Sequence, residues 1–216
     1  MTQRILVTGA TGRTGRLVVE GLLGLPETPI VRVLARTAEQ ERAGADRGLE
    51  TALGDVRDDT TSWADAAMRD VDTVISAMGG TPFKQNNLWR VDYEGTLRLL
   101  AAARTAGVGH YVFISTMGLR RERSILHPLS ILFYPKLLAE DAIRRSGIDY
   151  TILRPGGLVD RGEAEPEGAR NTREQVAEAC LGALARPDAR GKTWEMSAER
   201  RAEPGADPIF GVAVEP

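Results

Sequence analysis

Residues 4–15 read RILVTGATGRTG, an apolar and β-branched run followed by three glycines in the spacing G-x-x-G-x-x-G. An amphipathic stretch of helical length comes directly after them. Glycines allow a tight turn and a close approach of the backbone to a pyrophosphate, and the N-terminus of a following helix adds unpaired N–H groups and a positive dipole end. A turn placed between a strand and a helix therefore predicts a pyrophosphate site, with a ligand-free turn as the alternative. The residues predicted to form this site are Gly9, Thr11, Gly12, Arg13, Thr14 and Gly15.

Short apolar runs and amphipathic stretches alternate along the rest of the chain, which is typical of βαβ units and a parallel sheet. We therefore expect a Rossmann-type α/β fold, a doubly wound parallel sheet with helices on both faces and a small C-terminal part. Strands are predicted at residues 4–8, 30–35, 50–53, 71–76, 110–115, 150–153 and 193–196. Helices are predicted at residues 14–25, 39–45, 88–105, 135–146 and 173–185.

Two segments lack this alternation and are predicted to be irregular, residues 117–134 and residues 156–170. The first ends at Pro135, which we expect to begin a helix, because a proline at the first helical position loses no hydrogen bond.

Length and composition suit a single domain of 216 residues, with a Rossmann domain at residues 1–197 and a linker and apolar tail at residues 198–216. The net charge of -2 gives no overall case for binding nucleic acid or an anionic membrane. One cysteine and two histidines exclude an internal disulfide and a Cys/His metal cluster, so no metal is predicted. No apolar run has the length of a membrane span or a signal peptide, so we expect a cytoplasmic location.

The residue after the second predicted strand indicates which dinucleotide binds. An NAD site usually has an acidic residue there, which accepts a hydrogen bond from the ribose 2′-hydroxyl. Here the strand ends at Ala35 and Arg36 follows; a guanidinium cannot accept a hydrogen bond but matches the geometry of a phosphate. Arg13 is expected to reach the same side. We therefore predict NADP(H) in preference to NAD(H), with a solvated surface arginine as the alternative.

Three motifs in this order resemble those of the atypical short-chain dehydrogenase/reductases. They are the turn at residues 9–15, the sequence GDVRD at residues 54–58 and the sequence DYTILRPG at residues 149–156. The chain is most similar to the NAD(P)H-binding group that includes biliverdin reductase B-like and NmrA-like proteins, and the resemblance covers residues 3–197.

The resemblance implies further cofactor-binding residues, most of which lie at or just after the carboxyl ends of predicted strands, where open α/β sheets bind their ligands. It places the adenine against Asp55 and Val56, and the ribose and phosphates along Ala77, Met78 and Gly79. It also places the nicotinamide end of the cofactor against Ser115, Thr116, Lys136, Pro155 and Gly156.

The catalytic pattern of the superfamily is incomplete in this chain. Many members pair a tyrosine and a lysine as Y-x-x-x-K, which puts both side chains on one helix face, where the lysine lowers the tyrosine pKa. Here Leu132 stands at the tyrosine position, and the nearest phenol is Tyr134, two residues before Lys136. Two interpretations stay open for Tyr134: it reaches a site with Ser115 and Lys136, or it packs in the core beside Phe133. The candidate catalytic residues implied are Ser115, Lys136 and Tyr134.

The leading functional hypothesis is an NADPH-dependent oxidoreductase that passes hydride to a small or planar acceptor such as a quinone, flavin or carbonyl. The resemblance supports it, because biliverdin reductase B-like members also lack the tyrosine and take the proton from solvent. The alternative is a non-catalytic NADP(H)-sensing regulatory protein of the NmrA-like type. A nucleotide-sugar epimerase or dehydratase is disfavoured by the short C-terminal part. We expect a small-molecule partner, no nucleic acid or membrane partner, and a monomer or homodimer.

Overall fold

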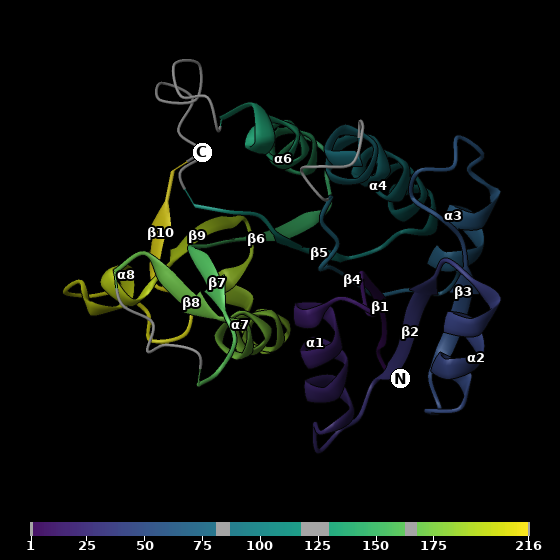
Figure 1. The fold of residues 1–216 in the computed structure, drawn as a ribbon, viewed down its shortest axis with the longest axis horizontal. Helices are drawn as coiled ribbons and strands as arrows, with labels where there is room; N and C mark the ends of the chain where they lie inside the picture. The colour runs from purple at the N-terminus through teal and green to yellow at the C-terminus, as the bar shows by residue number, and fades with distance from the viewer. Residues whose placement is uncertain (1, 81–86, 118–129, 163–167, 216) are drawn as a thin grey trace.

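One large, mostly parallel sheet runs through the molecule in the computed structural model, which describes residues 2–80, 87–117, 130–162 and 168–215 (Figure 1). All neighbouring strands are parallel except the last one, which pairs antiparallel at the edge. The first six strands of the chain lie in the order β3-β2-β1-β4-β5-β6, which confirms the doubly wound Rossmann arrangement. In spatial order the strands are β10 (Val212–Val214), β9 (Lys192–Met196), β6 (Asp149–Pro155), β5 (His110–Ile114), β4 (Thr73–Ser76), β1 (Arg4–Thr8), β2 (Ile30–Ala35) and β3 (Glu50–Leu53).

Helices cover both faces of the sheet because side chains alternate along each buried strand. On β1, Ile5 and Val7 join one apolar core and Leu6 joins the other. The first core lies under α1 (Arg13–Leu23), α2 (Ala38–Ala45) and α7 (Arg173–Ala185). The second lies under α3 (Ser62–Met68), α4 (Gly95–Ala106) and α6 (Ser130–Arg144). Within the described ranges, no helix is long and apolar enough to cross a membrane.

The predicted strands are confirmed, three of them with the same bounds and the others within two residues. The helices at residues 14–25, 39–45, 88–105 and 173–185 are confirmed as well, although the third begins with a π-helical turn, η1 (Trp89–Glu94). Helix α3 was not predicted. Its seven residues are too few to show a helical period.

The prediction of an irregular segment at residues 156–170 is wrong in part, because β7 (Gly157–Val159) and β8 (Arg170–Thr172) form a small second sheet. Three-residue strands carry no alternation that sequence reasoning can detect. The stretch expected to be a linker contains the short helix α8 (Ala198–Ala202), and the apolar tail docks. Phe210 is fully buried against Trp194, and β10 pairs with β9.

The predicted start of the fourth helix at Pro135 is wrong. Helix α6 begins at Ser130 and holds Pro135 in its interior. A proline there lacks the N–H that would bond to the carbonyl of residue 131, so the helix loses one hydrogen bond. Pro135, Leu137 and Ala139 are all buried, and packing of this kind supplies most of the stability of protein helices. Of the predicted irregular segment 117–134, residues 118–129 lie outside the described part.

The pH dependence of folding stability is expected to reflect His110, which begins β5 and is 1% exposed. Burial lowers the pKa of His110 to about 4, helped by the charge of Arg190 and opposed by that of Asp149. Its Nε2 lies 3.0 Å from the Thr151 hydroxyl oxygen. In the unfolded chain the ordinary histidine pKa is about 6.5. Below that pH the unfolded state binds a proton at this histidine and the folded state does not, so the folded state becomes less stable.

We therefore predict that His110 lowers the free energy of unfolding by roughly 1.4 kcal/mol per pH unit as the pH falls from about 6.5 towards 4. Denaturant unfolding at several pH values checks this, with His110→Gln as the reference because its side chain does not titrate. The difference in unfolding free energy between wild type and variant is expected to change across this window and to be constant above it. A constant difference throughout would contradict the buried neutral histidine.

Candidate functional site

The glycine turn after β1 is packed against its neighbours at two of its three glycines. Gly9 has a φ of 74°, and an added Cβ would lie 2.6 Å from the carbonyl oxygen of Ala77. A Cβ on Gly15 would lie 2.1 Å from the carbonyl oxygen of Gly9. Gly12 differs, since an added Cβ would meet only the Gly9 carbonyl oxygen, at 3.2 Å. Gly9 and Gly15 are therefore required by the turn itself, whereas a Cβ at Gly12 would need only a small shift of the Gly9 carbonyl.

The N-terminal end of α1 is free to face an anion. Gly12 is its N-cap residue, so no side chain caps the helix, and the first turn contains no acidic residue. The unpaired backbone N–H groups and the positive end of the helix dipole thus remain available. These are the properties of a phosphate-binding helix terminus.

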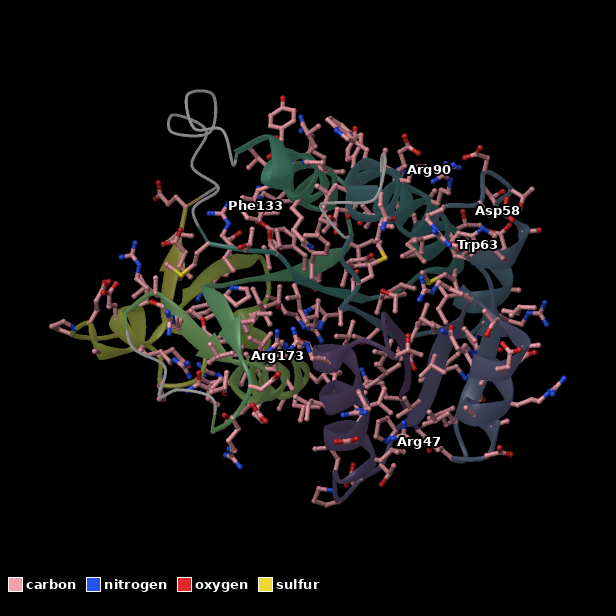
Figure 2. All side chains as sticks on the ribbon, in the orientation of Figure 1. Arg47, Asp58, Trp63, Arg90, Phe133 and Arg173 are labelled. Carbon is pink, nitrogen blue, oxygen red and sulfur yellow. The ribbon has the colours of Figure 1, made fainter. Side chains whose placement is uncertain are left out.

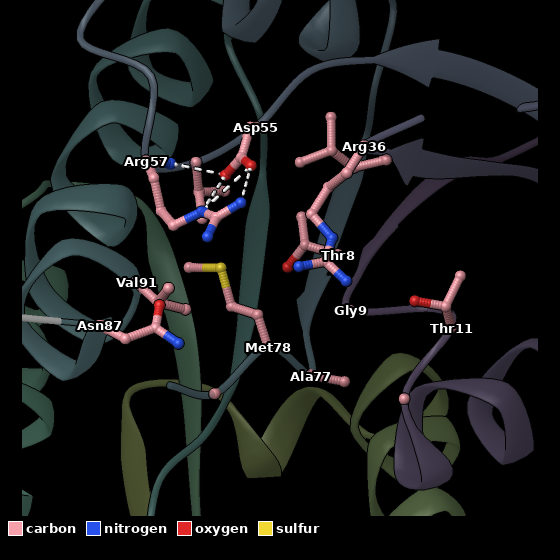
Figure 3. A pocket seen from close by; sticks show the side chains of 14 residues that line it. Thr8, Gly9, Thr11, Arg36, Asp55, Arg57, Ala77, Met78, Asn87 and Val91 are labelled. Atoms are coloured by element: carbon pink, nitrogen blue, oxygen red, sulfur yellow. Dashed lines mark hydrogen bonds and ion pairs between the residues drawn. The ribbon is translucent and has the colours of Figure 1, made fainter. Parts of the chain in front are cut away.

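A pocket of about 360 Å³ opens beside this turn, at the edge of the sheet where β1, β2, β3 and β4 end (Figure 3). The lining brings together many of the residues singled out in the sequence: Gly9, Thr11, Gly12, Arg36, Asp55, Val56, Ala77, Met78 and Gly79. The sequence analysis missed the rest of the lining: Thr8, Leu34, Arg57, Asn87 and Val91. Arg57 lies inside the 54–58 motif and could have been found there, whereas Asn87 and Val91 come from a distant helix.

Arg36 stands at the end of β2 with its side chain directed into this pocket, towards the glycine turn (Figure 3). Its backbone N–H donates to the Gln40 side-chain oxygen at 2.9 Å, and the Thr37 hydroxyl caps α2 by accepting from the Gln40 N–H. The start of α2 thereby fixes the backbone at Arg36, while the guanidinium remains exposed.

Arg13 does not join Arg36, contrary to the prediction. Its Nη1 lies 2.7 Å from Oδ2 of Asp160, which also lies 2.6 Å from Nη1 of Arg173 through Oδ1. Asp160 follows β7, a strand that the sequence did not reveal. Thr14 and Gly15 also stand outside the pocket lining, in the first turn of α1.

A second group of predicted residues gathers at the ends of β5 and β6. The Ser115 N–H donates to the Leu153 carbonyl oxygen at 2.7 Å, and Met117, after Thr116, donates to the Pro155 carbonyl oxygen at 2.8 Å. The Ser115 hydroxyl is buried and has no hydrogen-bond partner within the described part of the chain.

Gly156, which follows the end of β6, lies against the neighbouring small sheet. Its N–H donates to Oδ1 of Asn171 at 2.9 Å. A Cβ at Gly156 would lie 1.8 Å from the Ala169 carbonyl oxygen, so this position requires glycine. The close approach fixes the backbone directly after Pro155.

Lys136 is held by a buried carboxylate that the sequence analysis missed. Its Nζ lies 3.2 Å from Oδ1 of Asp92 and donates to the Ile114 carbonyl oxygen at 3.2 Å. Asp92 is 2% exposed and also accepts the Gly80 N–H. It lies in the π-helical turn η1, and such turns are frequent at functional sites. No sequence signal indicates this turn, so the pairing with a lysine on another helix was not predictable.

Tyr134 does not pack in the core, contrary to one of the two interpretations. It is 43% exposed and Phe133 is 40% exposed. The Tyr134 ring contacts the edge of Trp89, with 6.1 Å between centroids. Lys136, by contrast, contacts Asp92, the Ile114 carbonyl and the Phe113 ring. Because Tyr134 is helical, its separation of two residues from Lys136 puts the two side chains on different faces.

A doubly wound sheet with a glycine turn at its switch point, an open helix N-terminus and an adjoining pocket defines an NAD(P)-binding protein. The model of a family described as NAD(P)H-binding matches residues 9–187, and the chain belongs to this family. Its relatives lie in the atypical short-chain dehydrogenase/reductase and NmrA-like reductase group.

Similar proteins include reductases of known structure. An uncharacterized chloroplastic protein of Arabidopsis thaliana is 32% identical over 93% of this chain and 79% of its own. An anaerobillin reductase from Escherichia coli O157:H7 is 27% identical, covers 87% of this chain and 92% of its own, and has a TM-score of 0.68. The triphenylmethane reductase of Citrobacter sp., solved with NADP(H), is 25% identical over 90% of this chain and 70% of its own, with a TM-score of 0.68. Since the plant relative is named chloroplastic, the cytoplasmic location stays a prediction.

The different surroundings of the glycines predict different effects of substitution. Gly12→Val is expected to keep the fold, because an added Cβ is tight against only one carbonyl oxygen, and to abolish measurable NADPH binding, because Gly12 lines the pocket at the phosphate site. Calorimetric titration with NADPH and a thermal unfolding midpoint measure the two properties.

Gly24→Val is the matched control, at the other end of α1, where an added Cβ lies 3.6 Å from the nearest carbonyl oxygens. It is expected to bind NADPH as wild type does. Normal NADPH binding by Gly12→Val would show that the turn is not the phosphate site.

Proposed function

We propose that the chain is an NADPH-dependent oxidoreductase that passes hydride to a small or planar acceptor. The observation that carries the proposal is the Arg36 guanidinium, which extends into the pocket beside the glycine turn. It stands where an NAD site would have an acidic residue, and it offers a planar fork of donors to a 2′-phosphate. This is the basis for preferring NADP(H) over NAD(H).

The residues present fit the cofactor. Gly12 lines the pocket where a pyrophosphate would contact the backbone, and the pocket continues from the turn past Arg36 to Asp55. Outside this pocket, after the end of β5, the Ser115 hydroxyl is buried without a hydrogen-bond partner among the described residues, as expected of a group that binds a ligand. The Lys136 ammonium is bonded to the carbonyl of Ile114, the residue before Ser115 in the chain.

Bound NADPH would supply the hydride. The chain would contribute binding and orientation: Lys136, fixed by Asp92 and by the carbonyl of Ile114, would bond the ribose hydroxyls. The phenol of Tyr134 turns instead to Trp89. The proton would then come from solvent, which suits an acceptor such as a quinone, flavin or carbonyl.

A second function, an NADP(H) sensor without catalysis, is favoured by one observation, the separation of Tyr134 from Lys136. A screen of NADPH oxidation against quinones, flavins and carbonyls separates the two functions. Oxidation well above the rate without protein, with at least one acceptor, supports the reductase. Tight NADPH binding without oxidation of any acceptor would favour the sensor.

Arg36→Ala is predicted to weaken NADPH binding roughly ten- to hundredfold and to leave NADH binding nearly unchanged, because a charge-assisted hydrogen bond to phosphate contributes about 1.5–3 kcal/mol. Calorimetry with both cofactors measures this. Arg47→Ala is the matched control, since Arg47 is exposed at the end of α2 away from the pocket (Figure 2). Equal affinities of the wild type for NADPH and NADH would contradict the proposed preference.

Tyr134→Phe is predicted to reduce turnover with any acceptor found by less than about tenfold, since loss of a true general acid usually lowers the rate a hundred- to ten-thousandfold. Lys136→Ala is expected to act mainly by weakening NADPH binding. The measurements are steady-state kinetics and calorimetry on both variants. A loss above a hundredfold for Tyr134→Phe with unchanged NADPH affinity would mean that the phenol is the proton donor after all.

A further inference from the structure

The far end of the pocket lies beyond Arg36, where β3 ends. Strands β1, β2 and β3 are neighbours in this order, and they end at the glycine turn, at Arg36 and just before Asp55. With phosphates at the turn and a 2′-phosphate at Arg36, the next position along the sheet is that of the base. Leu34, Val56 and Val91 give it apolar walls, and Asp55 is its acceptor of hydrogen bonds.

Arg57 donates hydrogen bonds to the Asp55 carboxylate from both its side chain and its backbone (Figure 3). Its Nε lies 2.9 Å from Oδ1 and 3.1 Å from Oδ2, and its Nη2 lies 2.5 Å from Oδ2. Its backbone N–H donates to Oδ1 at 2.9 Å. A carboxylate offers about four lone pairs, and these three donors occupy about three of them. Because Nε is shared between the two oxygens, acceptor capacity equivalent to about one lone pair is left for a ligand.

A carboxylate held in this way recognises one kind of base. The hydrogen bond from Arg57 lowers the pKa of Asp55, and the charge of Arg36 acts in the same direction, so the group remains ionised and accepts only. An adenine presents an amino group that donates to such an acceptor. A purine with an oxygen at this position presents a second acceptor, and two unpaired acceptors repel each other.

Resting on the proposed function, we propose that Arg57 is a positioning residue that sets the base specificity of the pocket. By fixing the Asp55 carboxylate with one lone pair exposed, it makes the pocket select adenine dinucleotides over their hypoxanthine counterparts. Arg36 has a separate role, because it lies at the end of β2 and contacts the ribose side of the same pocket.

A lysine at position 57 tests this role without changing the net charge. Lysine is a point charge, whereas the arginine fork bonds both carboxylate oxygens at once, so the substitution preserves the electrostatic potential but releases the carboxylate. The readout is the ratio of the two dissociation constants, for nicotinamide hypoxanthine dinucleotide phosphate and for NADPH, both in reduced form. A purely structural role of Arg57 would weaken both ligands equally and leave this ratio unchanged.

We expect the intact wild-type chain to bind NADPH about tenfold or more tightly than the hypoxanthine dinucleotide, because the hypoxanthine oxygen replaces a charge-assisted hydrogen bond with a repulsive contact. Arg57→Lys is expected to lower this preference at least threefold, and Asp55→Asn to bring the ratio near one, since an amide also donates. In both variants the preference for NADPH over NADH is expected to persist. Arg36→Ala is the matched control, expected to lose the preference for NADPH over NADH and to keep the base preference.

The binding measurements distinguish failure of the proposed function from failure of the role of Arg57. If the wild type binds none of these dinucleotides, the proposed function fails, and this role of Arg57 fails with it. If the wild type binds NADPH but does not discriminate between the bases, or if Arg57→Lys keeps the wild-type base preference, only the role of Arg57 is overturned. Thermal unfolding midpoints near that of the wild type show that the variants are folded.

Discussion

The backbone contact of Gly9 with the peptide between Ala77 and Met78 is the constraint on which the site depends. It joins the ends of β1 and β4, the two central strands, at the point where the chain changes direction across the sheet. No Cβ fits there, and none fits at Gly15. The turn therefore has one shape, which leaves the α1 N-terminus open towards the pocket. The residues after β2 and β3 then line up beside it because the strands are parallel and in register.

Most of this arrangement could be predicted from the sequence. Strand β1 and the glycine spacing define the turn, and parallel pairing brings Arg36, Asp55 and Met78 to the same edge. What failed were features decided by tertiary contacts. Pro135 predicts a helix start because proline is favoured there, but burial along α6 allows the helix to continue through it. The position of Arg13 in the glycine turn predicts that it reaches the Arg36 side, but it pairs with Asp160, which follows a strand too short to recognise in the sequence.

The catalytic end was less predictable for a physical reason. A Y-x-x-x-K spacing specifies a helix face, and its absence leaves the direction of Tyr134 open in the sequence. In the structure Tyr134 contacts Trp89, whereas Lys136 contacts Asp92. The group that does hold Lys136, Asp92, comes from a π-helical turn 44 residues earlier in the chain, and no local pattern links the two. The structure thus supports a site that binds and orients a dinucleotide through buried groups, with Ser115 left unpaired within the described residues.

The central claim, that a dinucleotide binds at the switch point of this sheet, is tested most directly by hydrogen–deuterium exchange of the intact chain with and without saturating NADPH. Slower exchange is predicted in peptides that cover residues 9–16, 34–37 and 54–57, because the cofactor would cover these backbone amides. No change is predicted over residues 203–213, which line a separate hollow near Arg186. Protection at residues 203–213, or none at the glycine turn, would contradict the account.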